Sequence, residues 1–427
     1  MEITHQILAP GVELLCVQTE KFKTGVFSVS LVMPLREETA TAHALIADVL
    51  YRGSEGYPDI ESISAATDEL YGASVGPSVR QRGESQSVCF SASFIDDCYA
   101  LDGTGVLEPT LALLGDLLLR PVTENGVFRE DFVRMEGLNL ADQIRARIND
   151  KRGWSIFRLT QEMCAGEPYA LDKLGSAEQA EQMSPAFLWN CYQTLLQQAR
   201  VVFYYGGSAH PQRVEEAVRT CFSPLLTPRA ADTSCLVLAH PKEPVREVTD
   251  RMDVGQGKLA MGFRTGGITM NHPDYPALLV FNALYGGTTN SRLFLHVRER
   301  LSLCYFASSM LDKLKGLMVV SSGVEFEKFA VAREEILAQL DSLGRGEFEQ
   351  EELEAARQAI LSGLRSGEDS QGRMEDHWVT QLVGGGTPAP LEALMEPVER
   401  VTAEDVARVA RGIKLDTIYY LTGKGEA

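Results

Sequence analysis

The chain has 427 residues, of which 44% are hydrophobic and 23% charged, a composition typical of soluble globular proteins and not of disordered ones. Its net charge of −19 argues against nucleic acid as a partner, because binding to phosphates requires a basic surface. The eight cysteines include no CxxC pair, which favours reduced thiols over a disulfide framework or a cysteine metal site. Without a recognisable signal peptide or an apolar stretch of roughly 20 residues, no membrane association and a cytoplasmic location are expected.

The first half of the chain mixes strand-like and helix-like periodicities. Apolar residues of the first helical segment, from Ala42 to Leu50, follow the i, i+3, i+4, i+7 spacing of a helix with one buried face. In chain order the patterns predict strands at 12–17 and 26–33, helices at 37–52 and 60–70, strands on both sides of Gly83, a helix at 109–119, one long or two stacked helices within 130–163, a strand at 201–205 and a helix at 211–221. This mixed order predicts an α+β fold.

The second half repeats the theme after a segment rich in proline. Residues 223–246 show little periodicity and predict a linker between an N-terminal domain at 1–222 and a C-terminal domain at 247–427. Beyond it the patterns predict strands at 258–263, 317–324 and 418–421 and helices at 276–285, 291–300, 329–343 and 347–366.

An internal repeat supports this division. Residues 44–54 read ALIADVLYRGS and residues 278–288 read LLVFNALYGGT, so that Leu50 and Tyr51 correspond to Leu284 and Tyr285. The same offset of 234 positions brings YGAS at 71–74 onto YFAS at 305–308 without a gap. We interpret the two halves as related domains in tandem.

A helix-borne zinc site needs two histidines one turn apart and a nearby carboxylate. The closest pair among the seven histidines is 24 positions apart, and neither HExxH nor HxxEH occurs. His43 lies on the first predicted helix, but Ala47, one turn later, cannot bind a metal. A self-contained zinc site is therefore not predicted.

The segment 285–305 of the second copy is the richer candidate. Arg298 ends a predicted helix and Tyr305, seven residues later, begins a strand, so the turn between them can bring guanidinium and phenol together. Such a pair can donate hydrogen bonds to a peptide carbonyl or to the oxyanion formed when water attacks it. Two alternatives stay open: Arg298 as part of a charged helix end and Tyr305 as a core aromatic residue.

Several of these motifs resemble those of the insulinase/pitrilysin superfamily, the inverted-motif zinc peptidases that include the mitochondrial processing peptidase and the core proteins of the cytochrome bc1 complex. The chain is most similar to the zinc-less, YfmF-type proteins of Gram-positive bacteria. The resemblance spans nearly the whole chain and rests on LYRGS at 50–54, DELYGA at 68–73, EMCAGEPY at 162–169, and GGTTNSRLF at 286–294 with Arg298 and Tyr305.

The resemblance implies two homologous α/β-sandwich domains per chain and a clam-shell assembly of two chains around a peptide. Active members bind zinc through HxxEH and a downstream glutamate, and a second domain supplies the arginine and tyrosine. Here the motif falls on residues 44–48, where Ala44, Ala47 and Asp48 replace the two histidines and the glutamate. The downstream glutamate falls on Asp142 or Gln143.

The functional expectation is therefore a catalytically incomplete subunit of a heterodimeric zinc peptidase that is inactive alone and binds no cofactor itself. Arg298 and Tyr305 would bind substrate and oxyanion in a shared site, Gly286, Gly287 and Asn290 would contribute to substrate binding, and a homologous partner would carry the zinc. The alternatives are a non-catalytic scaffold or peptide-binding protein like the bc1 core proteins, and a self-sufficient hydrolase with an unrecognised metal site. A homodimer is possible in isolation.

Overall fold

The computed structural model describes residues 1–101, 103, 105–300 and 304–424. The chain divides into two compact units, each built from three segments. Unit 1 consists of residues 1–145, 171–234 and 370–388, and unit 2 consists of residues 146–170, 235–369 and 389–427. The sequence-based division into 1–222 and 247–427 treats each half as continuous. In the structure, residues 146–170 of the first half belong to unit 2, and residues 370–388 of the second half belong to unit 1.

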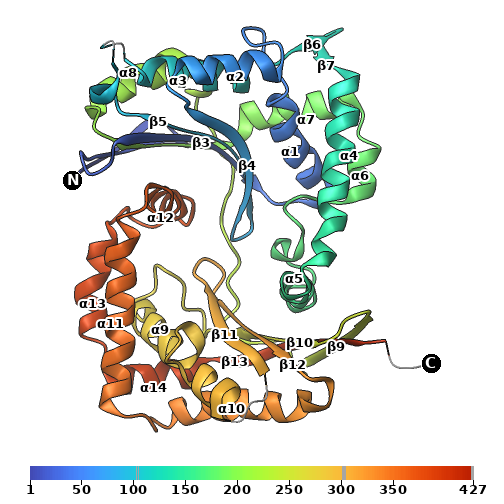
Figure 1. The fold of residues 1–427 in the computed structure, drawn as a ribbon, viewed down its shortest axis with the longest axis vertical. Coiled ribbons are helices and arrows are strands. Elements are labelled where there is room, and N and C mark those ends of the chain that lie inside the picture. The colour runs from blue at the N-terminus through green and yellow to red at the C-terminus, as the bar shows by residue number, and fades with distance from the viewer. Residues whose placement is uncertain (102, 104, 301–303, 425–427) are drawn as a thin grey trace. The chain divides into compact units, whose positions relative to one another are not determined.

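Unit 1 is built on a six-stranded sheet with the strand order β1-β2-β8-β3-β5-β4 (Figure 1). Its strands are β1 (Glu2–Ala9), β2 (Val12–Gln18), β3 (Thr24–Pro34), β4 (Ser74–Arg82), β5 (Ser85–Ile95) and β8 (Arg200–Gly207). The central strand β3 is buried on both faces. Phe27, Val29 and Leu31 face the main core, whereas Val26 and Val32 alternate with them and join a smaller cluster on the opposite face.

The helices that cover the main core of unit 1 include all those predicted for this part of the chain except α5 (Lys151–Met163). They are α1 (Glu37–Leu50), α2 (Ile60–Glu69), α3 (Leu107–Leu119), α4 (Glu130–Ala146), α6 (Ala177–Glu181), α7 (Pro185–Gln198) and α8 (Pro211–Cys221), with a small hairpin of β6 (Thr123–Glu124) and β7 (Val127–Phe128). Leu45, Ile46 and Val49 of α1 lie in this core, as the spacing predicted. The strand β1 and the helices α6 and α7 were not predicted.

Unit 2 has a five-stranded sheet with the order β11-β12-β10-β13-β9. The strands are β9 (Arg246–Met252), β10 (Gly257–Arg264), β11 (Cys304–Asp312), β12 (Leu317–Val324) and β13 (Lys414–Gly423). Its core is covered by α9 (Tyr275–Asn282), the π-helices η5 (Ala283–Gly287) and η6 (Leu293–Arg300), α10 (Phe329–Gly344), α11 (Gln350–Gly367), α13 (Met395–Glu399) and α14 (Ala403–Gly412). Helices combined with mixed sheets in both units confirm the predicted α+β class.

The two sheets share one topology, which gives the sequence repeat a structural counterpart. In unit 1 the order β4-β5-β3-β8-β2 consists of antiparallel neighbours except for the parallel pair β8 and β2. In unit 2 the order β11-β12-β10-β13-β9 has the same pattern, with β13 and β9 as the parallel pair. The segment after Tyr71 forms β4, and the segment that contains Tyr305 forms β11, so the repeated residues lead into equivalent edge strands.

The exchanged segments place one helix of each half on the sheet of the other. Helix α5 (Lys151–Met163) packs on β10 and β13 of unit 2, where Leu159 contacts Ala260 and Tyr419 in a buried cluster. Helix α12 (Gln371–Val383) packs on β8 and β3 of unit 1, where Trp378 and Leu382 cover Val202. The region 130–163 forms two helices, α4 and α5, which belong to different units.

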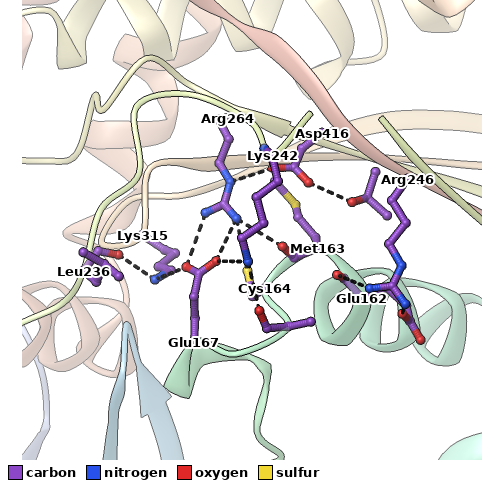
Figure 2. A network of polar contacts seen from close by, with 12 residues as sticks. Glu162, Met163, Cys164, Glu167, Leu236, Lys242, Arg246, Arg264, Lys315 and Asp416 are labelled. Carbon is purple, nitrogen blue, oxygen red and sulfur yellow. Dashed lines mark hydrogen bonds and ion pairs between the residues drawn. The ribbon is translucent and has the colours of Figure 1, made fainter. Parts of the chain in front are cut away.

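A buried ionic network fixes the end of α5 in unit 2 (Figure 2). Glu167, just beyond α5, accepts hydrogen bonds from Arg264 of β10 at 3.0 Å and pairs with Lys315 at 2.8 Å. Arg264 also donates to Asp416 of β13 at 3.0 Å. Burial alone would raise the pKa of Glu167, but the hydrogen bonds from Lys315 and Arg264 outweigh it and lower the pKa.

A second carboxylate joins α12 to unit 1 in the same manner. Glu375 is buried, accepts a hydrogen bond from Ser28 of β3 at 3.1 Å and pairs with Arg80 of β4 at 2.6 Å. Arg82 donates to Asp376 at 3.1 Å and to Thr380 of the same helix. Each exchanged segment therefore brings an acidic residue to basic residues of the sheet that it covers.

Candidate functional site

Arg298 and Tyr305 lie on two elements of unit 2 that pack against each other. Arg298 is near the end of η6 and Tyr305 is the second residue of β11. Residues 301–303, which belong to the predicted turn between them, lie outside the described residues. The Tyr305 residue is 68% exposed, so it is not a core aromatic residue.

The guanidinium of Arg298 has two neighbours on its own helix. It lies 4.5 Å from the centroid of the Phe294 ring, and its Nε is 3.4 Å from a carboxylate oxygen of Glu299. With the side chain of Arg298 41% exposed, the ion pair is screened by water and contributes little to stability. The guanidinium is thus partly exposed to solvent.

The glycines before η6 have a structural requirement of their own. Gly286 is buried at the end of η5, and a Cβ there would come within 2.7 Å of the backbone N of Ser309 on β11. Gly287 and Asn290 are exposed. The close approach explains Gly286 without a substrate, and the substrate-binding role of Gly286, Gly287 and Asn290 stays a prediction.

The positions that correspond to the zinc motif lie on α1. Ala44 and Ala47 are buried in the main core of unit 1 and carry no ligand atom. His43 points its Nδ1 at the side-chain oxygen of Gln86, 3.0 Å away, and burial lowers its pKa to about 4. His43 is thus a hydrogen-bonded core residue.

Asp48 has an acidic neighbour, Glu136 of α4. Burial, and then the Glu136 carboxylate, raise the pKa of Asp48 to about 6. Glu136 is buried, pairs with Arg52 at 3.4 Å and accepts a hydrogen bond from Asn139. The guanidinium of Arg52 supplies a positive charge beside these carboxylates.

These residues do not fit a zinc ion. Asp142 and Gln143, where the downstream glutamate was expected, are exposed on α4. Within the residues that the structure describes, no group of three or more His, Cys, Asp or Glu side chains could hold a metal. In the same part of the chain, no helix is both long and apolar enough to cross a bilayer.

Comparison with known proteins agrees with this incomplete site. A family model described as "Peptidase M16 inactive domain" matches residues 182–360. The protein described as "Probable inactive metalloprotease YmfF" of Bacillus subtilis is 33% identical over 409 residues, which cover 95% of each chain. The chain belongs to the M16 peptidase family. The relative from Bacillus subtilis carries the name YmfF, where the sequence analysis expected a YfmF-type protein.

Two further proteins are similar to this M16 chain. A crystal structure of a conserved protein from Enterococcus faecalis superposes with a TM-score of 0.91 at 25% identity and covers 100% of both chains. The "Uncharacterized zinc protease YmxG" of Bacillus subtilis is 27% identical over 41% of this chain and 42% of that protein. The chain is thus a homologue of an inactive M16 metalloprotease, and its insulinase/pitrilysin resemblance is confirmed.

Glu136 and Arg52 were missed by the reading of the sequence. Glu136 is seven residues before Gln143 on α4, which is close to two helical turns, but this spacing alone does not tell which residue faces α1. Arg52 follows α1, and the sequence analysis placed it at the end of the predicted helix 37–52. Their pairing depends on how close α4 lies to the residues that follow α1, which only the fold provides.

Proposed function

We propose that this M16 chain is the zinc-less subunit of a two-chain peptidase, in which Arg298 and Tyr305 bind the substrate peptide and stabilise the oxyanion. The observation that carries the proposal is the contrast between the two halves. Buried alanines fill the motif positions on α1, whereas unit 2 presents an exposed phenol and a half-exposed guanidinium on adjoining elements.

The chemistry assigned to this chain is hydrogen-bond donation. A guanidinium offers five N–H donors in a fixed plane, and a phenol offers one O–H donor. Donors placed at the position where negative charge develops lower the barrier to carbonyl attack more than they stabilise the ground state. The metal and the general base would come from the partner, because Ala44 and Ala47 supply neither.

The proposed partner is a homologous M16 chain that carries HxxEH. Bacillus subtilis contains both a relative named as a probable inactive metalloprotease and one named as a zinc protease, which supports a division of labour between two such chains. The chamber is proposed to form between the two proteins, and the isolated chain is expected to have no peptidase activity.

The test is reconstitution from two purified chains. This protein is mixed with the HxxEH-bearing M16 chain of the same organism, and cleavage of a quenched fluorescent peptide is followed. We expect cleavage only by the mixture, and Arg298→Ala or Tyr305→Phe lowers kcat/KM by about 100-fold, as does loss of one oxyanion donor in other enzymes.

A matched control is Arg333→Gln, on α10, where the arginine pairs with Glu247 on the surface of unit 2. This variant is expected to leave kcat/KM unchanged. Full cleavage by the Arg298→Ala mixture would contradict the assigned role. A stable complex that cleaves nothing would instead support the non-catalytic scaffold.

A further inference from the structure

Strand β11 carries one extra residue at the position of Tyr305. Its pairing with β12 shifts in register between Cys304 and Ala307. Within that interval Tyr305 and Phe306 of β11 lie opposite a single residue of β12, Gly323. Two residues opposite one define a β-bulge, a feature that often changes the direction of a side chain beside an active site.

The bulge changes which side chains of β11 face the core of unit 2. Cys304 and Ala307 are both buried in that core, although residues three apart point to opposite faces of a regular strand. The extra residue thus leaves Tyr305 and Phe306 together on the side away from the core. Because Tyr305 is exposed there, the bulge decides how its phenol is presented.

The hydroxyl of Ser322 on β12 fixes the bulge from the core side. Ser322 is fully buried and donates a hydrogen bond to the main-chain carbonyl oxygen of Phe306 at 2.9 Å. Since a bulge disrupts the ladder, its buried main-chain groups need such partners from side chains. Burial raises the pKa of the Cys304 thiol, whereas a hydrogen bond with Ser322 and the charge of Arg298 lower it. Ser322 thus contacts the residues on both sides of Tyr305.

Gly323 provides the space for the Phe306 ring on the opposite side of the sheet. A Cβ at Gly323 would come within 2.7 Å of that ring, so a larger residue would displace it. The guanidinium of Arg152, on α5, lies 4.4 Å from the centroid of the same ring and donates to the Ser308 hydroxyl at 2.9 Å. Phe306 is therefore anchored, while Tyr305 beside it stays exposed.

The equivalent strand of unit 1 has a regular register. From Ser74 to Arg82, β4 pairs with β5 without a shift. Tyr71, which corresponds to Tyr305 in the repeat, precedes that strand and has a φ of 58°. The bulge therefore accompanies the copy of the repeat that holds Arg298 and Tyr305.

We propose that Ser322 and Gly323 are positioning residues for Tyr305, and that they hold the bulge in the conformation that presents its phenol to the substrate peptide. This inference rests on the proposed function, because it explains how a donor of that site is oriented. An oxyanion donor must lie about 3 Å from the developing charge, and a displacement of about 1 Å can cost about 100-fold in rate. The support from β12 is thus expected to matter for the reaction.

Fluorine NMR of the isolated full chain tests the orientation without any partner. The protein is labelled with 3-fluorotyrosine at its 13 tyrosines, and the Tyr305 signal is identified by its loss in Tyr305→Phe. We expect this signal to shift in Ser322→Ala, which removes the hydroxyl, and to return towards the wild-type position in Ser322→Thr, which retains one. Gly323→Ala should shift it as well, because the added methyl group displaces the Phe306 ring.

Ser321→Ala is the matched control for Ser322→Ala. Ser321 is the preceding residue on β12 and is also buried, but in the described part of the chain its hydroxyl has no hydrogen-bond partner. The same chemical change at this position should leave the Tyr305 signal in place.

Cleavage by the reconstituted mixture tests the consequence for the reaction. Ser322→Ala should lower kcat/KM by about tenfold, and Tyr305→Phe should then cost about tenfold in that background instead of about 100-fold. A phenol that is already displaced has less to lose, whereas a purely structural effect of Ser322 would leave the cost of Tyr305→Phe unchanged. Ser321→Ala should alter neither value.

Three results would overturn the proposal. These are a Tyr305 signal that stays in place in both Ser322→Ala and Gly323→Ala, an equal effect of Ser321→Ala, and an undiminished cost of Tyr305→Phe in the Ser322→Ala background. A mixture that cleaves nothing would overturn the proposed function instead, and the fluorine signal of the isolated chain would still decide whether β12 orients Tyr305.

Discussion

At the scale of single residues, Asp48 opposes folding at neutral pH. Its pKa is about 6 in the folded protein, whereas the usual value for an aspartate is 3.8, so the folded state favours the protonated acid. The protonated group stabilises the folded state below pH 3.8, and this stabilisation is lost as the pH rises through 6. Asp48→Asn should therefore raise the free energy of unfolding by about 1 to 2 kcal/mol at pH 8 and change little at pH 4, measured by urea denaturation.

Asp142→Asn is the matched control for this prediction, because Asp142 is exposed on the neighbouring helix α4. It should leave the stability unchanged at both pH values. An Asp48→Asn protein that is less stable at pH 8 would show that the ionised carboxylate makes a favourable contact.

Glu167 shows the opposite electrostatic effect. The buried cations Arg264 and Lys315 depend on its carboxylate, and removal of one partner from a buried ionic network typically costs about 3 kcal/mol or more. Glu167→Gln should lower the free energy of unfolding by about this amount at pH 7. Because the pKa of Glu167 is lowered from its usual 4.5, its contribution is present above pH 4.5 and lost as the pH falls through the folded value.

The difference between wild type and Glu167→Gln should consequently shrink below pH 4.5. Glu396→Gln is a control, because Glu396 forms an exposed pair with Arg400 and should contribute less than about 0.5 kcal/mol. A Glu167→Gln variant as stable as wild type at pH 7 would show that Asp416 alone compensates the cations.

At the scale of elements, the contact between η5 and β11 depends on Gly286. Gly286→Ala should lower the free energy of unfolding by about 1 to 3 kcal/mol, because the added methyl group overlaps the backbone of Ser309. Gly363→Ala is the contrasting control on α11, where a Cβ meets nothing within 4 Å. That substitution should stabilise the protein by about 0.5 to 1 kcal/mol, measured in the same urea titration. A tolerated Gly286→Ala would favour a direct role in ligand binding.

Local periodicity predicted most of these elements, because each helix or strand carries its own pattern of buried side chains. The strand β12, predicted at 317–324, forms at Leu317–Val324, and α10, predicted at 329–343, ends at Gly344. The edge strands β1 and β9 were not predicted, because exposed edge strands carry polar residues that interrupt the alternation of apolar and polar side chains. Helix α12 was not predicted at all. The contact partners of α5 were not predicted either, because an amphipathic helix specifies a buried face but not the sheet that covers it.

The candidate site was predictable to the extent that it depends on residue identity. The loss of a histidine ligand at Ala44 and of the glutamate at Ala47 follows from the sequence, and so does the spacing of Arg298 and Tyr305. The hydrogen bond that Arg152 donates could not be foreseen, because it depends on which strands α5 crosses. Its partner Ser308 is 156 positions away in the sequence.

At the scale of the whole molecule, the exchange of segments makes the two halves of the chain depend on each other for folding. A fragment of residues 1–234 lacks α12 and would expose the apolar residues that α12 covers, among them Leu15, Val17, Val202 and Tyr204. A fragment of residues 235–427 lacks α5 and Glu167, so Arg264 and Lys315 would lose the Glu167 carboxylate, although Arg264 keeps its contact with Asp416. Neither fragment is expected to fold alone.

A cut chain should nevertheless hold together. We expect that a chain with a protease site inserted between Ser234 and Cys235 elutes as one species in size-exclusion chromatography after cleavage, with the circular dichroism of the uncut protein. The reason is that residues 146–170 remain packed in unit 2 and residues 370–388 in unit 1, each with its apolar cluster and buried carboxylate. The uncut insertion protein is the control for the insertion itself. Separation of the fragments under native conditions would mean that these contacts are too weak to join the halves without the covalent link.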